Sequence, residues 1–421
     1  MKGQLIKQHR KYRDLTLEEL ASGICSASYL SKIEHNTINA SDEIYRLLGE
    51  KLNIKLDNLN EEFDDNIYEQ LFHWHEAIKF KDTELMDKLY RTCKSSLAKN
   101  HNIELANLYK VILSRYKLAA KSKPLSKKTL KELHDVFSQS SQEYRFLYYK
   151  TIGLHYFLLA DYKNAIKHFH SADEVLEQLP LSDHELYYHL ALSYNRLRMY
   201  VESNYYAEIA LDSYQNSLNY QRVTDCHILL AINFNCLEVY HVAERLFLKL
   251  LRVSKNQLNL TEQGKVYHNL GCVNYNQGKY EQALDYLQEA LDFKKKQGIS
   301  TVSTLFLLAE THYYGNNSEE SAWEYLSLGE AEALQSNDLK YIHKLFVLKH
   351  IILHTTHKPS FIEKLEKKII PDFRELNEYE DYKEHLELLG EIYYEKRMYK
   401  KCSMLFIEAN RYKTAQKKDL Y

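Results

Sequence analysis

The chain of 421 residues is 45% hydrophobic and 27% charged, and its formal net charge is −2. It contains only 11 Gly and 4 Pro, which argues against sandwiches, barrels and doubly wound sheets, because those folds use both residues in many tight turns. The balanced charge excludes a global field of the kind that marks nucleic-acid or membrane binders. We therefore expect an all-α protein in which any such role is local.

The sequence predicts a cytoplasmic location. Residues from Met1 to Asp14 are polar and basic, without the apolar segment of a secretory signal. The apolar stretches are much shorter than the ~20 residues that cross a bilayer. Six cysteines are scattered without a CxxC pair, as is typical of free thiols in a reducing compartment.

Residues 1–60 predict a compact helical module that comes before the rest of the chain. Thr16 and Glu19 have the S/T-x-x-E spacing of a capping box, which starts a short helix. Gly23 supplies a turn, and a second helix follows over Ser26–Glu34, where Asn36 can form a left-handed cap. With flanking helices near 3–12 and 41–52, this is a helix-turn-helix. The string LTLEELA…SYLSKIE resembles the XRE/Cro-type repressor module, which implies DNA binding.

Two groups of side chains in this module are suited to DNA. Small and hydrogen-bonding residues on the second helix can approach base edges in a major groove, while Leu30 and Ile33 must face inward. The first helix is basic and suited to phosphate contacts. The alternative is an HTH-like bundle that mediates only protein contacts. The candidate DNA-binding residues are Lys7, Arg10, Lys11, Arg13, Thr16, Ser26, Ala27, Ser28, Tyr29, Ser31 and Lys32.

From residue 64 to 421 the chain repeats a helical pair. In VYHNLGCVNYNQGKYEQALDYLQEAL, which begins at Val266, a helix with Gly271 precedes a turn at Gly278, and the next helix carries Ala283. This resembles the tetratricopeptide (TPR) repeat, whose helices need small residues where their backbones cross.

The repeat recurs with a steady period. The small residue of the second helix recurs with steps of 38, 40, 40, 39 and 80 residues, at Ala165, Ser203, Ala243, Ala283, Ala322 and Cys402. A tyrosine lies three residues earlier at Tyr162, Tyr200, Tyr240, Tyr280 and Tyr399, and a second small residue lies seven later at Ala172, Ala210, Ala290 and Ala409. With less regular pairs near 64–100, 101–142 and 338–378, we expect nine hairpins in a right-handed superhelix. Most of the 36 Tyr are then core residues.

No catalytic, metal or cofactor motif is present in the sequence. His350 and His354 are four apart, but no Glu follows His350 as HExxH requires. GxGxxG, GxxxxGK[ST] and GxSxG are absent. We expect no catalytic residue, no metal site and no cofactor.

The groove of the repeats is the predicted binding surface. The first helix of each TPR hairpin lines the concave face, and Asn can hold an extended peptide because it offers a donor and an acceptor to the peptide's amides. The alternative is that these side chains cap helices or bind a neighbouring repeat. The candidate peptide-binding residues are Asn195, Arg196, Asn233, Asn235, Asn269, Asn274, Tyr275, Asn276 and Tyr313.

An XRE-type module followed by a TPR array resembles the cytoplasmic peptide-pheromone receptors of Gram-positive bacteria, the RRNPP family, and the number of hairpins is most similar to its NprR members. The stretch CHILLAINFNCLEVYHVAERLF is similar to the family repeat with a peptide-anchoring asparagine, which implies that role for Asn233 or Asn235. The resemblance implies a homodimeric or larger quorum-sensing transcription regulator that binds double-stranded DNA and a short imported peptide.

Two other functions stay open at this point. Rap members of the family bind and dephosphorylate response regulators through a catalytic Gln in an N-terminal bundle. The matching stretch here, His101–Lys117, contains no Gln, so we expect the chain not to be an enzyme, although it could still bind a response regulator. The third reading is a TPR scaffold without a peptide ligand.

Overall fold

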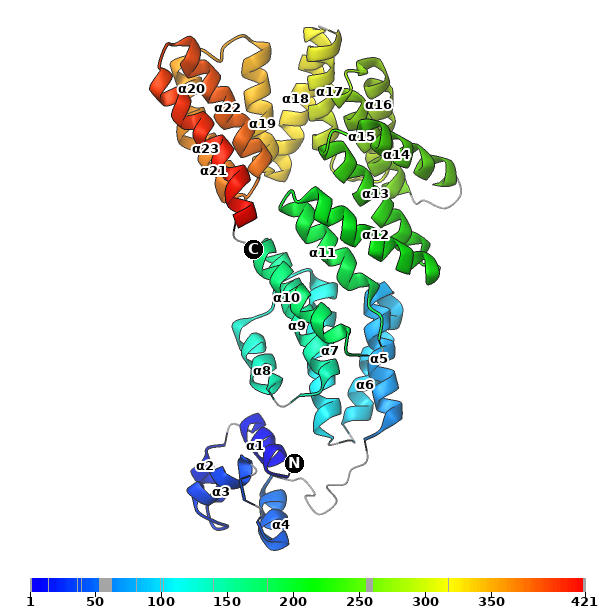
Figure 1. The fold of residues 1–421 in the computed structure, drawn as a ribbon, viewed down its shortest axis with the longest axis vertical. Helices are drawn as coiled ribbons and strands as arrows, with labels where there is room; N and C mark the ends of the chain where they lie inside the picture. Colours follow the sequence, from blue (N-terminus) through cyan, green and yellow to red (C-terminus); the bar gives the residue numbers. More distant parts are fainter. Residues whose placement is uncertain are drawn as a thin grey trace. The chain divides into compact units, whose positions relative to one another are not determined.

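The computed structural model describes residues 2–13, 15–35, 37–38, 40–52, 63–80, 82–98, 100, 102–138, 140–179, 181–254, 260–316 and 318–418. All regular secondary structure in these ranges is helical, as the composition predicts. None of the helices in them has the length and apolar character needed to cross a membrane. The chain forms two compact units (Figure 1): one comprises Met1–Leu158 and Ser171–Pro180, the other Leu159–His170 and Leu181–Tyr421.

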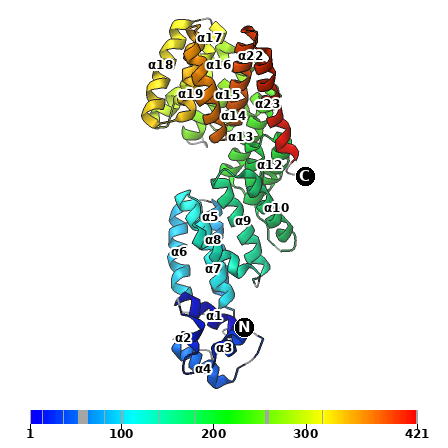
Figure 2. The same cartoon turned by 90° about the vertical axis from the view of Figure 1, so that its left-hand side faces the viewer.

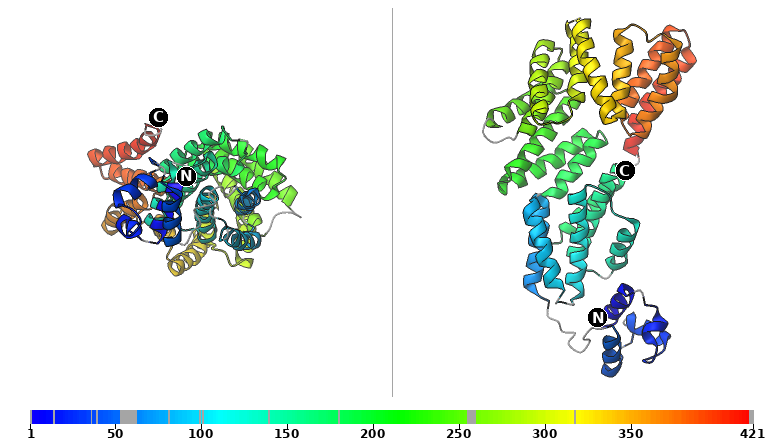
Figure 3. Two further views of the ribbon diagram at one scale, coloured as in Figure 1. Left: turned by 90° about the horizontal axis from the view of Figure 1, so that it is seen from below. Right: turned by 180° about the vertical axis from the view of Figure 1, so that it is seen from behind.

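The N-terminal module is a bundle of short helices, drawn in dark blue in Figure 3. The helices are α1 (Lys2–Tyr12), α2 (Leu17–Ala21), α3 (Ala27–Glu34) and α4 (Asp42–Lys51). The predicted capping box is confirmed: Thr16 Oγ1 accepts from the Glu19 backbone N–H at 3.1 Å, and the Glu19 carboxylate accepts from the Thr16 N–H at 2.7 Å. Gly23 makes the turn with φ +77°. The cap predicted at Asn36 lies outside the described residues.

The same unit continues with the first repeat helices, which surround an aromatic core. Trp74 is fully buried, and its ring lies 5.5–5.7 Å from those of Tyr90, Tyr109 and Tyr116. These rings come from three helices, so they fix how the first two hairpins pack. The helices are α5 (Asp65–Phe80), α6 (Thr83–Leu97), α7 (Ile103–Lys121), α8 (Lys127–Phe137) and α9 (Gln142–Leu158), and α10 (Tyr162–Leu176) belongs to both units.

In the second unit, from its second hairpin onward, the first helix of each hairpin packs on the second helix of the hairpin before it (Figure 2). The first helices are α11 (His184–Arg196), α13 (Tyr220–Cys236), α15 (Leu260–Asn276), α17 (Val302–Asn316), α19 (Leu339–Ile352) and α22 (Tyr379–Glu395). Their partners are α12 (Tyr200–Asn216), α14 (Tyr240–Ser254), α16 (Tyr280–Lys296), α18 (Glu319–Ser336), the irregular segment α20 (Pro359–Lys364), η1 (Leu365–Ile369) and α21 (Ile370–Glu375), and finally α23 (Tyr399–Lys418). Within the described residues this gives the nine predicted hairpins.

The predicted repeat register is confirmed by burial and by helix starts. The five recurring tyrosines are the first residues of α10, α12, α14, α16 and α23. The aligned small residues are at most 8% exposed. The residue two before each tyrosine has a positive φ, at Ala160, Arg198, Glu238, Gly278 and Arg397. The turn therefore keeps its left-handed residue even where the sequence does not supply glycine.

Close helix crossing explains the glycine of the best repeat. A Cβ on Gly271 would lie 2.5 Å from Leu287 Cγ, closer than carbon atoms approach. Only glycine lets α15 and α16 cross at this separation.

The tyrosines differ more in burial than the sequence predicts. Several are buried, but Tyr205, Tyr220 and Tyr394 are 61–65% exposed.

Candidate functional site

Helix α3 of the N-terminal module presents a polar outer surface. Ser26 caps the helix by accepting from the Tyr29 N–H at 3.1 Å. Leu30 and Ile33 are fully buried, as predicted, so the opposite side of α3 faces solvent. Ser28 and Lys32 are exposed there. Ala27, Tyr29 and Ser31 are half-buried, and Tyr29 also packs against the module core.

Arg10 has a structural role that the sequence analysis missed. Its guanidinium donates to both carboxylate oxygens of Glu34, at 2.6 and 2.8 Å, and to the Leu15 carbonyl at 2.8 Å. The side chains are 11% and 1% exposed. Hydrogen bonding to Glu34 raises the pKa of Arg10. Because these donors are in use inside the module, Arg10 is not available for the phosphate contact that the sequence predicts.

The other predicted phosphate-contacting residues are more accessible. Lys11 and Arg13 are exposed. Lys7 is half-buried, with its Nζ 3.3 Å from His35 Nε2. Thr16 is exposed, but its hydroxyl serves the capping box. Lys11 and Arg13 therefore offer accessible positive charge at the end of α1, a helix that packs against α3.

In the second unit the first helices of successive hairpins contact each other, and we call the surface they share the inner face. Two of the predicted asparagines lie inside the protein and below this surface. Asn233 is fully buried; it donates to Ser203 Oγ and Asn204 Oδ1, both at 2.8 Å, and accepts from Asn195 Nδ2 at 2.7 Å. Asn274 is also fully buried and donates to the Leu270 carbonyl at 2.9 Å. Asn233 therefore holds neighbouring helices together, which was the alternative reading, whereas Asn274 bonds to a carbonyl of its own helix α15.

The remaining asparagines are closer to solvent. Asn276 is exposed and donates to Asn235 Oδ1 at 3.2 Å, which links α15 to α13. Asn235 is half-buried, and its Nδ2 lies 3.9 Å from Cys272 Sγ, a weak contact. Asn269 donates to the Lys265 carbonyl of its own helix at 2.8 Å. Asn195 is half-buried. Of the two candidates for a peptide anchor, Asn235 is the accessible one.

The predicted aromatic and basic residues differ in how far they are exposed to solvent. Tyr275 is half-buried, and its ring lies 5.8 Å from that of Tyr280. Arg196 is exposed at the end of α11. Tyr313 packs against the core of the neighbouring hairpins, whereas Tyr314, which was not predicted, is 47% exposed and lines a cavity.

That cavity lies between α17, α19 and α22 and has a volume of about 250 Å³. Its apolar lining includes Phe306, Val347 and Leu388, and its polar lining includes Glu310, Tyr314, Lys344, Glu384, His385, Glu387 and Glu391. Acidic groups therefore outnumber basic ones in its wall.

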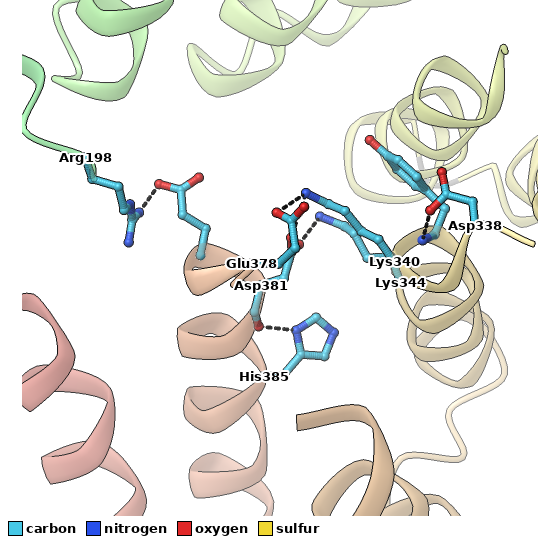
Figure 4. A network of polar contacts seen from close by, with 9 residues as sticks. Arg198, Asp338, Lys340, Lys344, Glu378, Asp381 and His385 are labelled. Atoms are coloured by element: carbon cyan, nitrogen blue, oxygen red, sulfur yellow. Dashed lines mark hydrogen bonds and ion pairs between the residues drawn. The ribbon is translucent and has the colours of Figure 1, made fainter. Parts of the chain in front are cut away.

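An ion-pair network borders this cavity (Figure 4). Asp381 accepts from Lys344 Nζ at 2.7 Å and lies 3.0 Å from Lys340 Nζ, which also reaches Glu378 at 2.7 Å. Burial opposes ionisation of Asp381, but the two ammonium groups lower its pKa. His385 Nδ1 lies 2.6 Å from the Asp381 carbonyl oxygen, and burial lowers its pKa.

Among the carboxyl groups of the inner face, that of Glu310 has the pKa furthest from its ordinary value. Burial raises its pKa to about 8, and the Lys344 ammonium only partly offsets this effect. At neutral pH the carboxyl is therefore mostly protonated. Within the described residues it has no ion pair at salt-bridge distance, so its charge depends on what enters the cavity.

A second contact joins hairpins that are far apart in the chain. Arg198, in the turn between α11 and α12, donates to the carboxylate of Glu380 on α22, and the Tyr200 hydroxyl lies 3.3 Å from the same oxygen (Figure 4). Arg198, Tyr200 and Glu380 all belong to the second unit. In the parts of the chain that the structure describes, no group of three or more His, Cys, Asp or Glu could hold a metal ion.

Known proteins share both parts of this architecture. Residues 6–59 match a helix-turn-helix family and residues 225–296 match the tetratricopeptide repeat. The transcriptional activator NprA of Geobacillus stearothermophilus is 27% identical over 92% of this chain and 97% of its own. The regulatory protein RapD of Bacillus subtilis (strain 168) is 24% identical over 80% of this chain and 96% of its own.

The solved structures agree on the fold. The apo form of the quorum sensor NprR from B. thuringiensis superposes with a TM-score of 0.69 at 20% identity, covering 85% of this chain and 99% of NprR. NprR in complex with its cognate peptide NprX gives 0.61 at 20% identity, covering 84% and 97%. The chain is therefore similar over most of its length to RRNPP-type regulators.

The charged part of the inner face was not predicted from the sequence. Glu310 is the only charged residue between Thr301 and Thr311, a stretch that is otherwise mainly apolar. A lone acid in such a helix signals a buried ionisable group, so it could have been found. Its partners Lys344 and Glu384 lie on other hairpins, and only the stacking of the repeats brings them together.

Proposed function

We propose that the chain is a cytoplasmic quorum-sensing transcription regulator, not an enzyme, that binds double-stranded DNA through α3 and is controlled by a short signalling peptide on the inner face. The observation that carries this proposal is the combination, in one chain, of a helix-turn-helix with a polar outer surface and a repeat array with accessible amide and carboxyl side chains. The likeness to a transcriptional activator over 92% of the chain supports it.

The proposed DNA-contacting residues form two groups, one suited to base edges and one suited to phosphates. Ser28 and Lys32 are exposed on α3 and able to donate to base edges, with Ser26, Ala27, Tyr29 and Ser31 around them. Lys11 and Arg13, with Lys7 and Thr16 nearby, contact phosphates and position the module without reading sequence. One module of this size makes few base contacts. Two copies on half-sites about 34 Å apart therefore supply the specificity, which implies a homodimer or larger oligomer.

The peptide contacts lie on the first helices. Asn235 and Asn276, with Asn195, Arg196, Asn269 and Tyr275, offer donors and acceptors to the amides of an extended peptide. Asn233, Asn274 and Tyr313 support these positions from within. Regulation requires that the peptide bind one arrangement of the repeats more tightly than another. Stacked hairpins can provide two arrangements because small rotations at each interface add up.

The test for DNA recognition starts from duplexes selected out of a random pool by the full chain. Replacing Ser28 and Lys32 with Ala removes base contacts, so the selected duplex should be bound more weakly by about 1–3 kcal/mol per contact while random DNA is nearly unaffected. The matched control, Lys11→Ala, should weaken both DNAs alike and reduce the salt dependence by about one ion. Equal losses in the first variant would mean that α3 does not read bases.

A second candidate function is binding of a response regulator, supported by the likeness to RapD over 80% of the chain. The surface would be the first hairpins, α5 to α8. Phosphate release from a phosphorylated receiver domain, with and without the protein, separates dephosphorylation from binding. The third reading, a scaffold without a peptide ligand, predicts that Asn235→Ala changes no ligand response.

A further inference from the structure

The turns of the last two hairpins bring many cations together at one edge of the second unit. The turn between α19 and α20 lies beside the turn between α22 and α23, since Lys396 Nζ donates to the His357 carbonyl at 3.3 Å. Residues 353–362 contain no acid, and residues 392–407 contain only Glu395. Six exposed cations lie in these turns or in the helix segments that follow them. We call them the basic edge: Lys358, Lys364, Lys396, Arg397, Lys400 and Lys401.

The protein does not neutralise the basic edge. Among the described residues, the ion pairs near these turns involve other side chains and none of the six cations. Burial lowers the pKa of the neighbouring His350, and the ammonium groups of Lys364 and Lys358 lower it further. Positive charge therefore accumulates here, although the net charge of the whole chain is −2.

Two of the lysines lie at the unfavourable end of their helix. Lys400 and Lys401 are in the first turn of α23, where the partial positive charge of the helix dipole disfavours a cation. The first turns of α12, α16 and α18 contain glutamate instead, at Glu202, Glu281 and Glu319. Lysine at this position therefore does not stabilise the repeat. A local rule broken without a gain in stability is typical of a residue that serves binding.

The arrangement fits an extended polyanion better than a single anion or a protein surface. The cations are distributed along two turns and the start of α23, and not around one point. Protein–protein interfaces are poor in Lys, whereas Lys, Arg and Tyr are usual donors to DNA phosphates. Tyr394 and Tyr399 are 62% and 58% exposed on either side of Lys396 and Arg397, so their hydroxyls can add such contacts.

We propose that the basic edge is a second DNA-contacting surface, which binds phosphates of double-stranded DNA outside the site that α3 reads. The proposal rests on the proposed function, because the helix-turn-helix brings the duplex to the chain. Phosphate contacts carry no sequence information, so the basic edge adds affinity without changing the selected sequence. Each cation that meets a phosphate steepens the slope of log affinity against log salt by about 0.9.

The experiment measures the affinity of the full chain for a long duplex in which the selected site lies between random flanks. The test variant combines Arg397→Gln, Lys400→Gln and Lys401→Gln. Its salt slope should be shallower than that of wild type by about 2.7, so its affinity should fall about 40-fold less between about 50 and 200 mM salt. Its preference for the selected site over random DNA should be unchanged. Its Tm should not fall, because two of the substitutions remove cations from the first turn of α23.

The matched control removes the same number and kind of charges from another part of the second unit. It combines Arg252→Gln, Lys295→Gln and Lys296→Gln, at residues that are exposed in the last turns of α14 and α16. Both variants change the net charge of the chain equally, so a general electrostatic effect would be the same in both. We expect the control to bind the long duplex with the affinity and salt slope of wild type.

The possible results separate this proposal from the proposed function. If the test variant keeps the affinity and salt slope of wild type, or if test and control variants lose affinity alike, the second surface is refuted and the helix-turn-helix function stands. If wild type binds vesicles of phosphatidylglycerol and phosphatidylcholine, and the test variant loses only that binding, the basic edge contacts an anionic membrane and not DNA. If wild type selects no duplex from the random pool, the proposed function fails, and the second DNA surface fails with it.

Discussion

Arg10→Met should unfold the N-terminal module locally, because it leaves a carboxylate buried without its cation. Glu34 is 1% exposed and loses both hydrogen bonds from the guanidinium, at 2.6 and 2.8 Å. Breaking a buried pair by removing one partner costs about 3–5 kcal/mol. At about 1.4 kcal/mol per tenfold change, the opening equilibrium of the module rises by about two to four decades.

Hydrogen–deuterium exchange of the full chain measures this opening directly. The amides of α1 and α3 should exchange faster by that factor, while those of α15 and α16 keep their rates and serve as an internal control. The double variant Arg10→Met with Glu34→Leu removes both charges, and it should recover most of the protection because a well-packed apolar pair can replace a buried ion pair.

A different result would restore the phosphate role that the sequence predicts for Arg10. If exchange in α1 and α3 changes by less than about tenfold, while DNA affinity falls equally for all sequences and the salt dependence drops by about one ion, the buried pair contributes little and our reasoning is wrong. A double variant no more protected than Arg10→Met would contradict it as well.

Two further predictions concern the repeats. Asn233→Ala should lower the free energy of unfolding by about 1–3 kcal/mol, because the fully buried Asn233 side chain loses three hydrogen bonds. Asn235→Ala should leave the free energy of unfolding nearly unchanged and weaken peptide binding. Chemical denaturation and peptide titration of the two variants separate these effects, and equal unfolding midpoints would contradict the first. Gly271→Ala places a Cβ 2.5 Å from Leu287 Cγ and should destabilise the protein by about 1–3 kcal/mol, measured as a lower Tm; an unchanged Tm would mean that α15 and α16 separate freely.

The sequence was sufficient to predict those features that depend on local spacing. The tyrosines that begin the second helices, the buried small residues and the Thr16–Glu19 capping box follow from positions close together in the chain, and each is confirmed. The close crossing at Gly271 was likewise readable, because only glycine satisfies it.

Features that depend on long-range packing were not readable. Arg10 and Glu34 are 24 residues apart, and nothing local distinguishes Arg10 from Lys11 as a phosphate contact. Asn233 and Asn235 differ by two positions, which on a helix turns one inward and leaves the other near solvent. The acidic cavity needs Glu310 and Glu384 from hairpins that only the stacking of repeats brings together.

The central claim is that a peptide on the inner face changes DNA binding by the module, and one titration tests it most directly. The affinity of the full chain for its selected duplex is measured by fluorescence anisotropy in wild type and in Asn235→Ala. Each measurement is made with and without a saturating heptapeptide that the full chain has selected from a random peptide library. We predict a change of about 5- to 150-fold, the usual range of coupling between two sites, that is reduced in the variant. An unchanged affinity for DNA while the peptide is bound would contradict the account.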